Sequence, residues 1–260
     1  MEQIKQTFNT EPSQSSGREL TGKFFIGLII GGIISALLFM VLSFVGSIFT
    51  EGMSQTGEFI KSNPILPLLL LLIGFLSSFI GNLSTAGIYG LFFSQRYYNT
   101  SKTMGLLLLT NGILFLILAP VYLIFSSDLN TLFIVLGFHI MLSVFLSINQ
   151  IEIVGNPNYA GSSLIGSTLG FAITILIYSL VRKGSSIGGT QEKLYLLLLL
   201  PSIIGFAIIP LGLGIREKIY YKMYEVGNNG FYTPSINNKP KKDEDLNSIE
   251  ENDDINIDLS

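Results

Sequence analysis

Six long apolar runs without an internal charge dominate this sequence. Each contains at least 20 residues, and a helix of about 20 apolar residues spans the roughly 30 Å hydrocarbon core of a bilayer. Backbone polar groups in lipid must pair within a helix or a closed barrel, and these runs do not alternate in polarity as barrel strands do. We therefore expect an all-α integral membrane protein, a polytopic bundle of about six transmembrane helices. The runs are residues 24–49, 64–93, 103–125, 129–148, 161–181 and 193–215.

The low charge content excludes other classes of fold. Only 13% of the 260 residues are charged and 48% are hydrophobic, whereas a soluble domain carries about 25% charged residues. Disorder over most of the chain is excluded too, because disordered segments combine low hydrophobicity with high charge. The first run is longer than the apolar core of a secretory signal, about 7 to 15 residues. We expect it to be a retained span.

The acidic residues are concentrated at one end of the chain. Eight of the 18 acids follow Lys242, so residues 1–242 hold all 15 bases against ten acids, a net charge of +5. A block of acids in a segment of low hydrophobicity is typical of a disordered interaction tail. We predict four parts: a polar N-terminal cytoplasmic segment (1–23), the six-helix transmembrane domain (24–215), an aromatic interfacial segment (216–235) and a disordered acidic C-terminal tail (236–260).

The bases near the ends of the runs predict an orientation. Lys and Arg collect on the cytoplasmic side of membrane proteins, and they precede the first run, follow the second and follow the last. With six spans these places share one side, so we expect both termini to be cytoplasmic, in the cytoplasmic membrane of a prokaryote. The loop with Arg182, Lys183 and Lys193 disagrees. Either the rule is overridden there, or the run 193–215, which contains prolines and glycines, is broken or re-entrant.

Tyrosines lie near the predicted ends of the runs. Amphipathic rings prefer the headgroup level of a bilayer, and the chain has no Trp. We therefore expect tyrosine alone to form the interfacial belt. The tyrosines concerned are Tyr97, Tyr98, Tyr122, Tyr159, Tyr178, Tyr195, Tyr220 and Tyr221.

Small residues spaced three or four apart predict helix-packing faces on three of the runs. Without large side chains, two helix backbones can approach closely in lipid. Our first interpretation is packing within this chain; the alternative is packing against another membrane protein or a second copy. The faces comprise Gly27, Gly31 and Ser35 on the first run, Gly74, Ser78 and Gly81 on the second, and Ser162, Gly166 and Gly170 on the fifth.

A polar stripe runs along the fourth span. His139, Ser143, Ser147 and Gln150 fall in one narrow sector of a helix at about 100° per residue. Ionisable residues inside a membrane are functional candidates by default, but imidazole and hydroxyl groups also bond between helices. Both interpretations stay open, interhelical hydrogen bonding or a path for a solute or proton. Asn111 on the third span is a further polar candidate.

The second run is longer than the hydrocarbon core requires. At about 1.5 Å per residue, thirty helical residues extend about 45 Å. The helix must therefore tilt, or it must break near Gly81 and Asn82, where the sequence becomes small and polar. A break at membrane depth would line a cavity or contact protein, which makes Asn82 another candidate for a polar pathway.

Several classes of chemistry have no residues to support them. The absence of Cys excludes thiolate sites, one histidine cannot supply a two-histidine zinc site, and the glycine-rich segment 184–189 lacks the Lys of a phosphate loop. The lone Glu152 is expected to be an interfacial residue. We expect no enzyme, no catalytic or metal-binding residue and no cofactor.

These observations favour a non-enzymatic multi-pass membrane protein, a scaffold or subunit of a membrane assembly. The alternative is a small channel or uncoupled transporter with its pathway near His139, and a lipid-modifying enzyme comes third. The expected partners are the lipid bilayer, other membrane proteins or a second copy through the small-residue faces, and a cytoplasmic partner of the acidic tail. No nucleic acid is expected.

Overall fold

The computed structural model describes residues 17–53, 65–93, 99–126, 129–155, 157–185, 191–216, 218–220 and 222. These residues form helices and their connections, with no strand among them, so the predicted all-α polytopic bundle is confirmed. The predicted acidic tail, 236–260, lies outside the described residues. So do most of the predicted N-terminal and aromatic interfacial segments.

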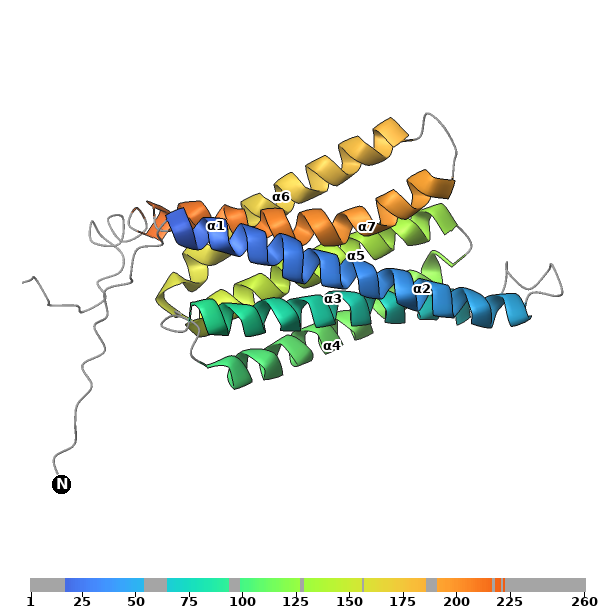
Figure 1. Ribbon diagram of the computed structural model, residues 1–260, viewed down its shortest axis with the longest axis horizontal. Coiled ribbons are helices and arrows are strands. Elements are labelled where there is room, and N and C mark those ends of the chain that lie inside the picture. The colour runs from blue at the N-terminus through green and yellow to red at the C-terminus, as the bar shows by residue number, and fades with distance from the viewer. Residues whose placement is uncertain are drawn as a thin grey trace, which may run out of the picture. The chain divides into compact units, whose positions relative to one another are not determined.

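The chain passes along the bundle in helices of alternating direction (Figure 1). The first pass combines an α-helix, a π-helix and a second α-helix, and the last ends in a 3₁₀ helix. The elements are α1 (Gly17–Ile26), η1 (Gly27–Ile33), α2 (Ile34–Met53), α3 (Ile65–Phe92), α4 (Thr100–Ile124), α5 (Leu129–Gly155), η2 (Pro157–Tyr159), α6 (Ala160–Ser185), α7 (Gln191–Ile208) and η3 (Ile209–Ile215).

Five helical segments of the described chain are long and apolar enough to cross a membrane. A shorter apolar helix, Leu199–Ile215, corresponds to the sixth predicted run and lies alongside the others (Figure 1). The five are Gly17–Val45, Ile65–Phe92, Thr100–Ile124, Thr131–Gly155 and Ala160–Lys183.

The last pass changes its helix type at a proline. α7 is α-helical through Pro201 and as far as Ile208, and it continues as the 3₁₀ helix η3, which contains Pro210. Proline lacks the N–H that would bond the carbonyl of Phe206, four residues earlier. That carbonyl oxygen lies against Gly27 so closely that a Cβ there would overlap it. The run 193–215, for which a break was one of two alternatives, therefore changes from α-helix to 3₁₀ helix beside Pro210, where the first pass packs.

The first pass contains a π-helical segment that its hydrophobicity does not predict. Gly27, Gly31 and Gly32 are all buried there. Gly31 faces the ring of Phe206, and Gly32 faces the backbone of Ile203. Because these glycines have no side chain, α7 approaches the widened turn directly, and the first and last passes are packed backbone to backbone.

α3 is one continuous α-helix from Ile65 to Phe92. The break considered near Gly81 and Asn82 is not found. Gly81 packs against the Phe206 ring and the carbonyl of Gly31, and the Asn82 side chain turns to α5, where it bonds Ser143. Small and polar residues at this depth therefore serve contacts between helices.

Two groups of buried apolar side chains fill the bundle. One joins α3, α4 and α5 through residues such as Leu71, Leu118 and Leu136. The other surrounds Tyr89 and Phe206, close to the end of the bundle where α1 begins. Large apolar side chains on the outer faces remain exposed, as a lipid-facing surface requires. Examples are Leu116, Ile124, Leu176 and Leu180.

We expect Gly166→Ala to destabilise the bundle and Gly112→Ala to leave it intact. A Cβ at Gly166 would meet the backbone of Gly212 in η3, whereas a Cβ at Gly112 meets nothing within 4 Å. Both glycines lie inside helices, where Ala is favoured by up to about 1 kcal/mol. Overpacking against rigid backbone should instead lower the free energy of unfolding of Gly166→Ala by about 1–3 kcal/mol.

The measurement is reversible unfolding in mixed micelles with increasing sodium dodecyl sulfate. Equal stability of the two variants would contradict the close approach of α6 and η3.

Candidate functional site

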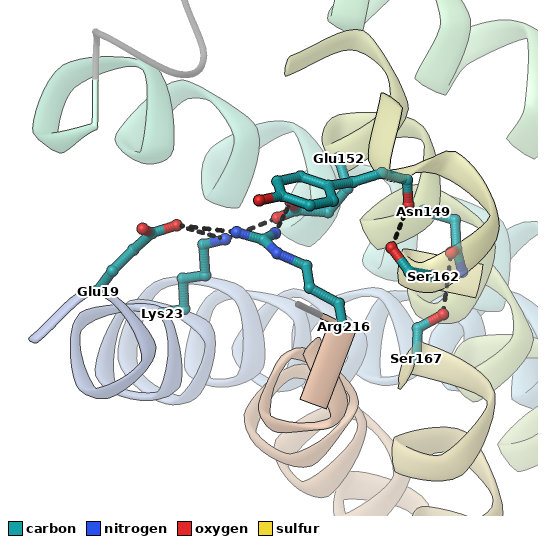
Figure 2. Close-up of polar contacts among 8 residues, drawn as sticks. Glu19, Lys23, Asn149, Glu152, Ser162, Ser167 and Arg216 are labelled. Carbon is teal, nitrogen blue, oxygen red and sulfur yellow. Dashed lines mark hydrogen bonds and ion pairs between the residues drawn. The ribbon is translucent and has the colours of Figure 1, made fainter. Parts of the chain in front are cut away.

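Four charged side chains meet inside the bundle at the end where α1 begins and η3 ends (Figure 2). Glu19 and Lys23 come from α1, Glu152 from α5, and Arg216 follows η3. We call these four residues the ion cluster. Lys23, Glu152 and Arg216 are at most 2% exposed, and Glu19 is 13% exposed. The cluster is therefore a buried electrostatic contact between the first, fourth and last passes.

Glu152 bonds both bases of the ion cluster. Its Oε1 accepts a hydrogen bond from Lys23 Nζ at 2.7 Å, and its Oε2 accepts one from Arg216 Nη1. Glu19 Oε1 lies 2.9 Å from Lys23 Nζ and 3.6 Å from Arg216 Nη2. Two acids and two bases cancel, which meets the requirement that buried charges be paired and hydrogen-bonded.

Aromatic rings cover both bases. Lys23 Nζ lies 5.8 Å from the centroid of Tyr89, and Arg216 Cζ lies 5.1 Å from that of Tyr159. These distances are within the range of cation–π attraction. The Tyr89 hydroxyl also donates to the backbone carbonyl of Lys23 at 3.4 Å, and Tyr159 packs edge-on against Tyr220. α3 and η2 thus hold the ion cluster from two further sides.

The sequence did not reveal that these charged residues meet. Glu152 was expected to be an interfacial residue, and the structure adds that α5 continues past residue 148 to Gly155 and that Glu152 is buried within the bundle. Lys23 precedes the first run and Arg216 follows the last, and both are buried against carboxylates. The alternating direction of six runs could have indicated this contact. It places the start of the first run and the ends of the fourth and last runs on the same side of the membrane.

The polar stripe of α5 is occupied by partners from α3 and α4. The Ser143 hydroxyl donates to Asn111 Oδ1 and accepts from Asn82 Nδ2 at 2.9 Å. Asn111 Nδ2 donates to Ser147 Oγ at 3.2 Å. The structure thus brings Asn82, Asn111, Ser143 and Ser147 together in one buried network across three helices.

The two ends of the stripe bond outside this network. His139 Nδ1 lies 3.2 Å from the Tyr122 hydroxyl, and the Gln150 amide donates to the Thr110 hydroxyl. Thr110 was not singled out from the sequence, and Tyr122 was expected only in the interfacial belt, because these two hydrogen bonds depend on how α4 packs against α5. Among the described side chains of the stripe and its partners, two buried acceptors, Asn82 Oδ1 and Gln150 Oε1, have no hydrogen-bond partner.

The predicted small-residue faces contact other helices of this chain. Ser35 bonds Ser202 on α7 at 3.2 Å, and Gly74 faces Leu136 and His139 on α5. The remaining contacts follow the same pattern or stay within one helix. Gly27 meets Phe206; Gly31 meets Phe206 and Thr85; Ser78 bonds the carbonyl of Gly74; Gly81 meets Gly31; Ser162 bonds the carbonyl of Tyr159; Gly166 meets Gly212; and Gly170 meets Ile209.

Three tyrosines expected in the interfacial belt are buried inside the protein instead. Tyr122, Tyr159 and Tyr178 are 0%, 1% and 6% exposed. Each is used by a specific contact: Tyr122 with His139, Tyr159 with Arg216, and Tyr178 beside Gly137. Position near the end of a run therefore does not decide whether a ring faces lipid. The side chains of Tyr97, Tyr98, Tyr195 and Tyr221 lie outside the described structure.

Within the described ranges, no three His, Cys, Asp or Glu side chains are placed to hold a metal ion. Comparison with protein-family models, curated proteins and solved structures finds no match to this chain. The arrangement of its own residues is therefore the basis for proposing a function.

We expect Glu152→Gln to be the most damaging change in the ion cluster. It leaves Lys23 and Arg216 buried with only Glu19 to balance them, and breaking a buried ion pair costs about 3–5 kcal/mol. Glu19→Gln is the matched control, because Glu19 contacts the same bases but is partly accessible to water. Glu19→Gln should therefore lower the free energy of unfolding by less than Glu152→Gln does.

The double variant Glu152→Gln with Arg216→Gln should recover part of the lost stability. It retains one matched pair, Lys23 with Glu19. The measurement is the free energy of unfolding of all three variants in mixed micelles. If Glu152→Gln is no worse than Glu19→Gln, Glu152 is not the central charge of the cluster.

Proposed function

We propose that this chain is a non-enzymatic multi-pass membrane protein that serves as a scaffold or subunit of a membrane assembly. In this proposal the bundle anchors the acidic segment 236–260, which binds a partner with a basic surface. The observation that carries the proposal is the fixed position of Arg216, the residue after η3, in the ion cluster.

The contacts of Arg216 give the following segment a rigid base. Its guanidinium bonds Glu152 of α5 and approaches Glu19 of α1, while η3 packs backbone to backbone on α6. Arg216 and η3 are therefore held by contacts with three other passes. A scaffold benefits from such a base, because a tethered segment has a higher effective concentration near a partner in the same membrane.

The distribution of charge supports a basic partner on the cytoplasmic side. Eight acids follow Lys242, and a block of like charge attracts an opposite surface over about a Debye length, near 8 Å at physiological salt. Lys102 and Lys218 lie at the ion-cluster end of the bundle and favour its cytoplasmic placement. We propose that both termini are cytoplasmic, and we keep the cytoplasmic membrane of a prokaryote as part of the proposal.

Purification in mild detergent with mass spectrometry of co-purifying proteins tests the scaffold. We expect a stoichiometric partner that is lost when residues 236–260 are deleted and when the eight acids after Lys242 are replaced by Asn and Gln. A tail of the same composition in scrambled order is the matched control and should retain a partner that reads charge. A partner retained by the deletion variant, or no stoichiometric partner, would refute this function.

A second candidate is a small channel or uncoupled transporter along the polar stripe. The observation that favours it is the pair of buried acceptors, Asn82 Oδ1 and Gln150 Oε1. An unpaired buried acceptor costs about 1–3 kcal/mol, and water or a hydroxylated solute would satisfy it. Asn82 also bonds Ser143 of the polar network, and Gln150 lies on the same stripe of α5 and bonds Thr110 of α4.

Flux of water and glycerol into proteoliposomes tests this second candidate. A pathway predicts flux above that of empty vesicles, and Asn82→Leu should reduce it to the empty-vesicle rate. Asn149→Leu is the control, because Asn149 bonds Ser167 of α6 and is not part of the stripe. Wild-type flux equal to that of empty vesicles eliminates the pathway.

A further inference from the structure

A crevice of about 390 Å³ opens between α5 and α6 at the end of the bundle opposite the ion cluster. Its lining includes the apolar side chains of Phe138, Met141 and Ile175. Its rim is polar and basic, with Arg182 and Lys183 in the last turn of α6. The crevice is therefore amphipathic along its length.

The order of residues on α6 places the apolar and the basic residues of the crevice at different depths. Ile175, Ser179 and Arg182 follow one another over two turns, about 10 Å at 1.5 Å per residue. Lys183 is the last residue of the apolar segment Ala160–Lys183. We therefore expect the basic rim to lie near the membrane boundary, with the apolar wall extending from it toward the centre of the bilayer.

We propose that this crevice binds one anionic phospholipid. The headgroup phosphate contacts Arg182 and Lys183, and an acyl chain lies along Phe138, Met141 and Ile175. Arginine presents five N–H donors in a fork that matches phosphate oxygens. Both bases also take part in interactions within the protein, and several donors on each allow a phosphate to be held as well.

The proposed lipid accounts for bases that the topology rule leaves unexplained. Arg182 and Lys183 lie at the end of the bundle that the orientation assigns to the outside, where Lys and Arg are usually sparse. A helix C-terminus stabilises a cation by about 0.3–1 kcal/mol. Stabilisation by the helix C-terminus does not require an apolar crevice next to the bases. A phospholipid would contact both the bases and the apolar crevice.

Quenching of an introduced tryptophan by brominated lipids tests the proposal. The chain has no Trp, so Phe138→Trp gives a single reporter in the crevice. Leu116→Trp, on the exposed face of α4, reports on bulk lipid. Each reporter is reconstituted in vesicles of phosphatidylcholine containing either brominated phosphatidylglycerol or brominated phosphatidylcholine.

We expect the Trp at position 138 to prefer phosphatidylglycerol by about fivefold for each base, and the Trp at position 116 to show no preference. Arg182→Gln with Lys183→Gln should remove the preference. The same charge change at Lys218 and Lys222, at the other end of the bundle, should preserve it.

Ser179→Phe provides a test that leaves every charge in place. Ser179 is an exposed residue that lines the crevice, so a bulky ring there should exclude the lipid and reduce the preference at position 138. Leu176→Phe, on the lipid-facing side of the same helix, should not. Equal quenching of the position 138 reporter by both lipids, or a preference that survives the loss of both bases, would overturn the proposal.

Discussion

One carboxylate connects the first pass of the bundle to its last. Glu152 accepts from Lys23 through one oxygen and contacts Arg216 through the other, so neither base is buried without a counter-charge. Replacing a buried ion pair by apolar groups is often neutral, but removing one partner is costly. The cluster therefore contributes mainly by specifying which passes meet at this end. Helices that bring the wrong neighbours together would bury a base without an acid.

The same two passes meet along their backbones. Pro210 deprives the Phe206 carbonyl of its helical donor, and the oxygen lies against Gly27 in the π-helical segment. Contact at this distance requires glycine, because any Cβ would overlap the carbonyl. Pro210, Gly27 and the π-helical turn therefore act together to allow this backbone contact. The ion cluster fixes the register of the first and last passes, and the glycines allow them to close along their length.

The fold follows from local sequence, whereas much of the site does not. Length and hydrophobicity of each run predict a spanning helix, and helical spacing correctly places Ser143 and Ser147 on one face of α5, where both bond Asn111. Lys23 and Glu152 are 129 positions apart, so their contact depends on tertiary packing. The apolar run ends at residue 148, before the polar Gln150 and Glu152, but the helix α5 continues to Gly155 and both side chains make contacts with α4 and α1.

The bases at the two ends of the bundle have different partners. This difference affects how the membrane orientation can be inferred from the positions of Lys and Arg. Lys23 and Arg216 are neutralised inside the ion cluster, so they exert little attraction on the surroundings. The proposed orientation then depends on the remaining bases at that end, such as Lys102 and Lys218. At the other end, Arg182 and Lys183 line an amphipathic crevice, and a bound anionic lipid would offset them locally. A base therefore counts toward orientation only after its own partner has been identified.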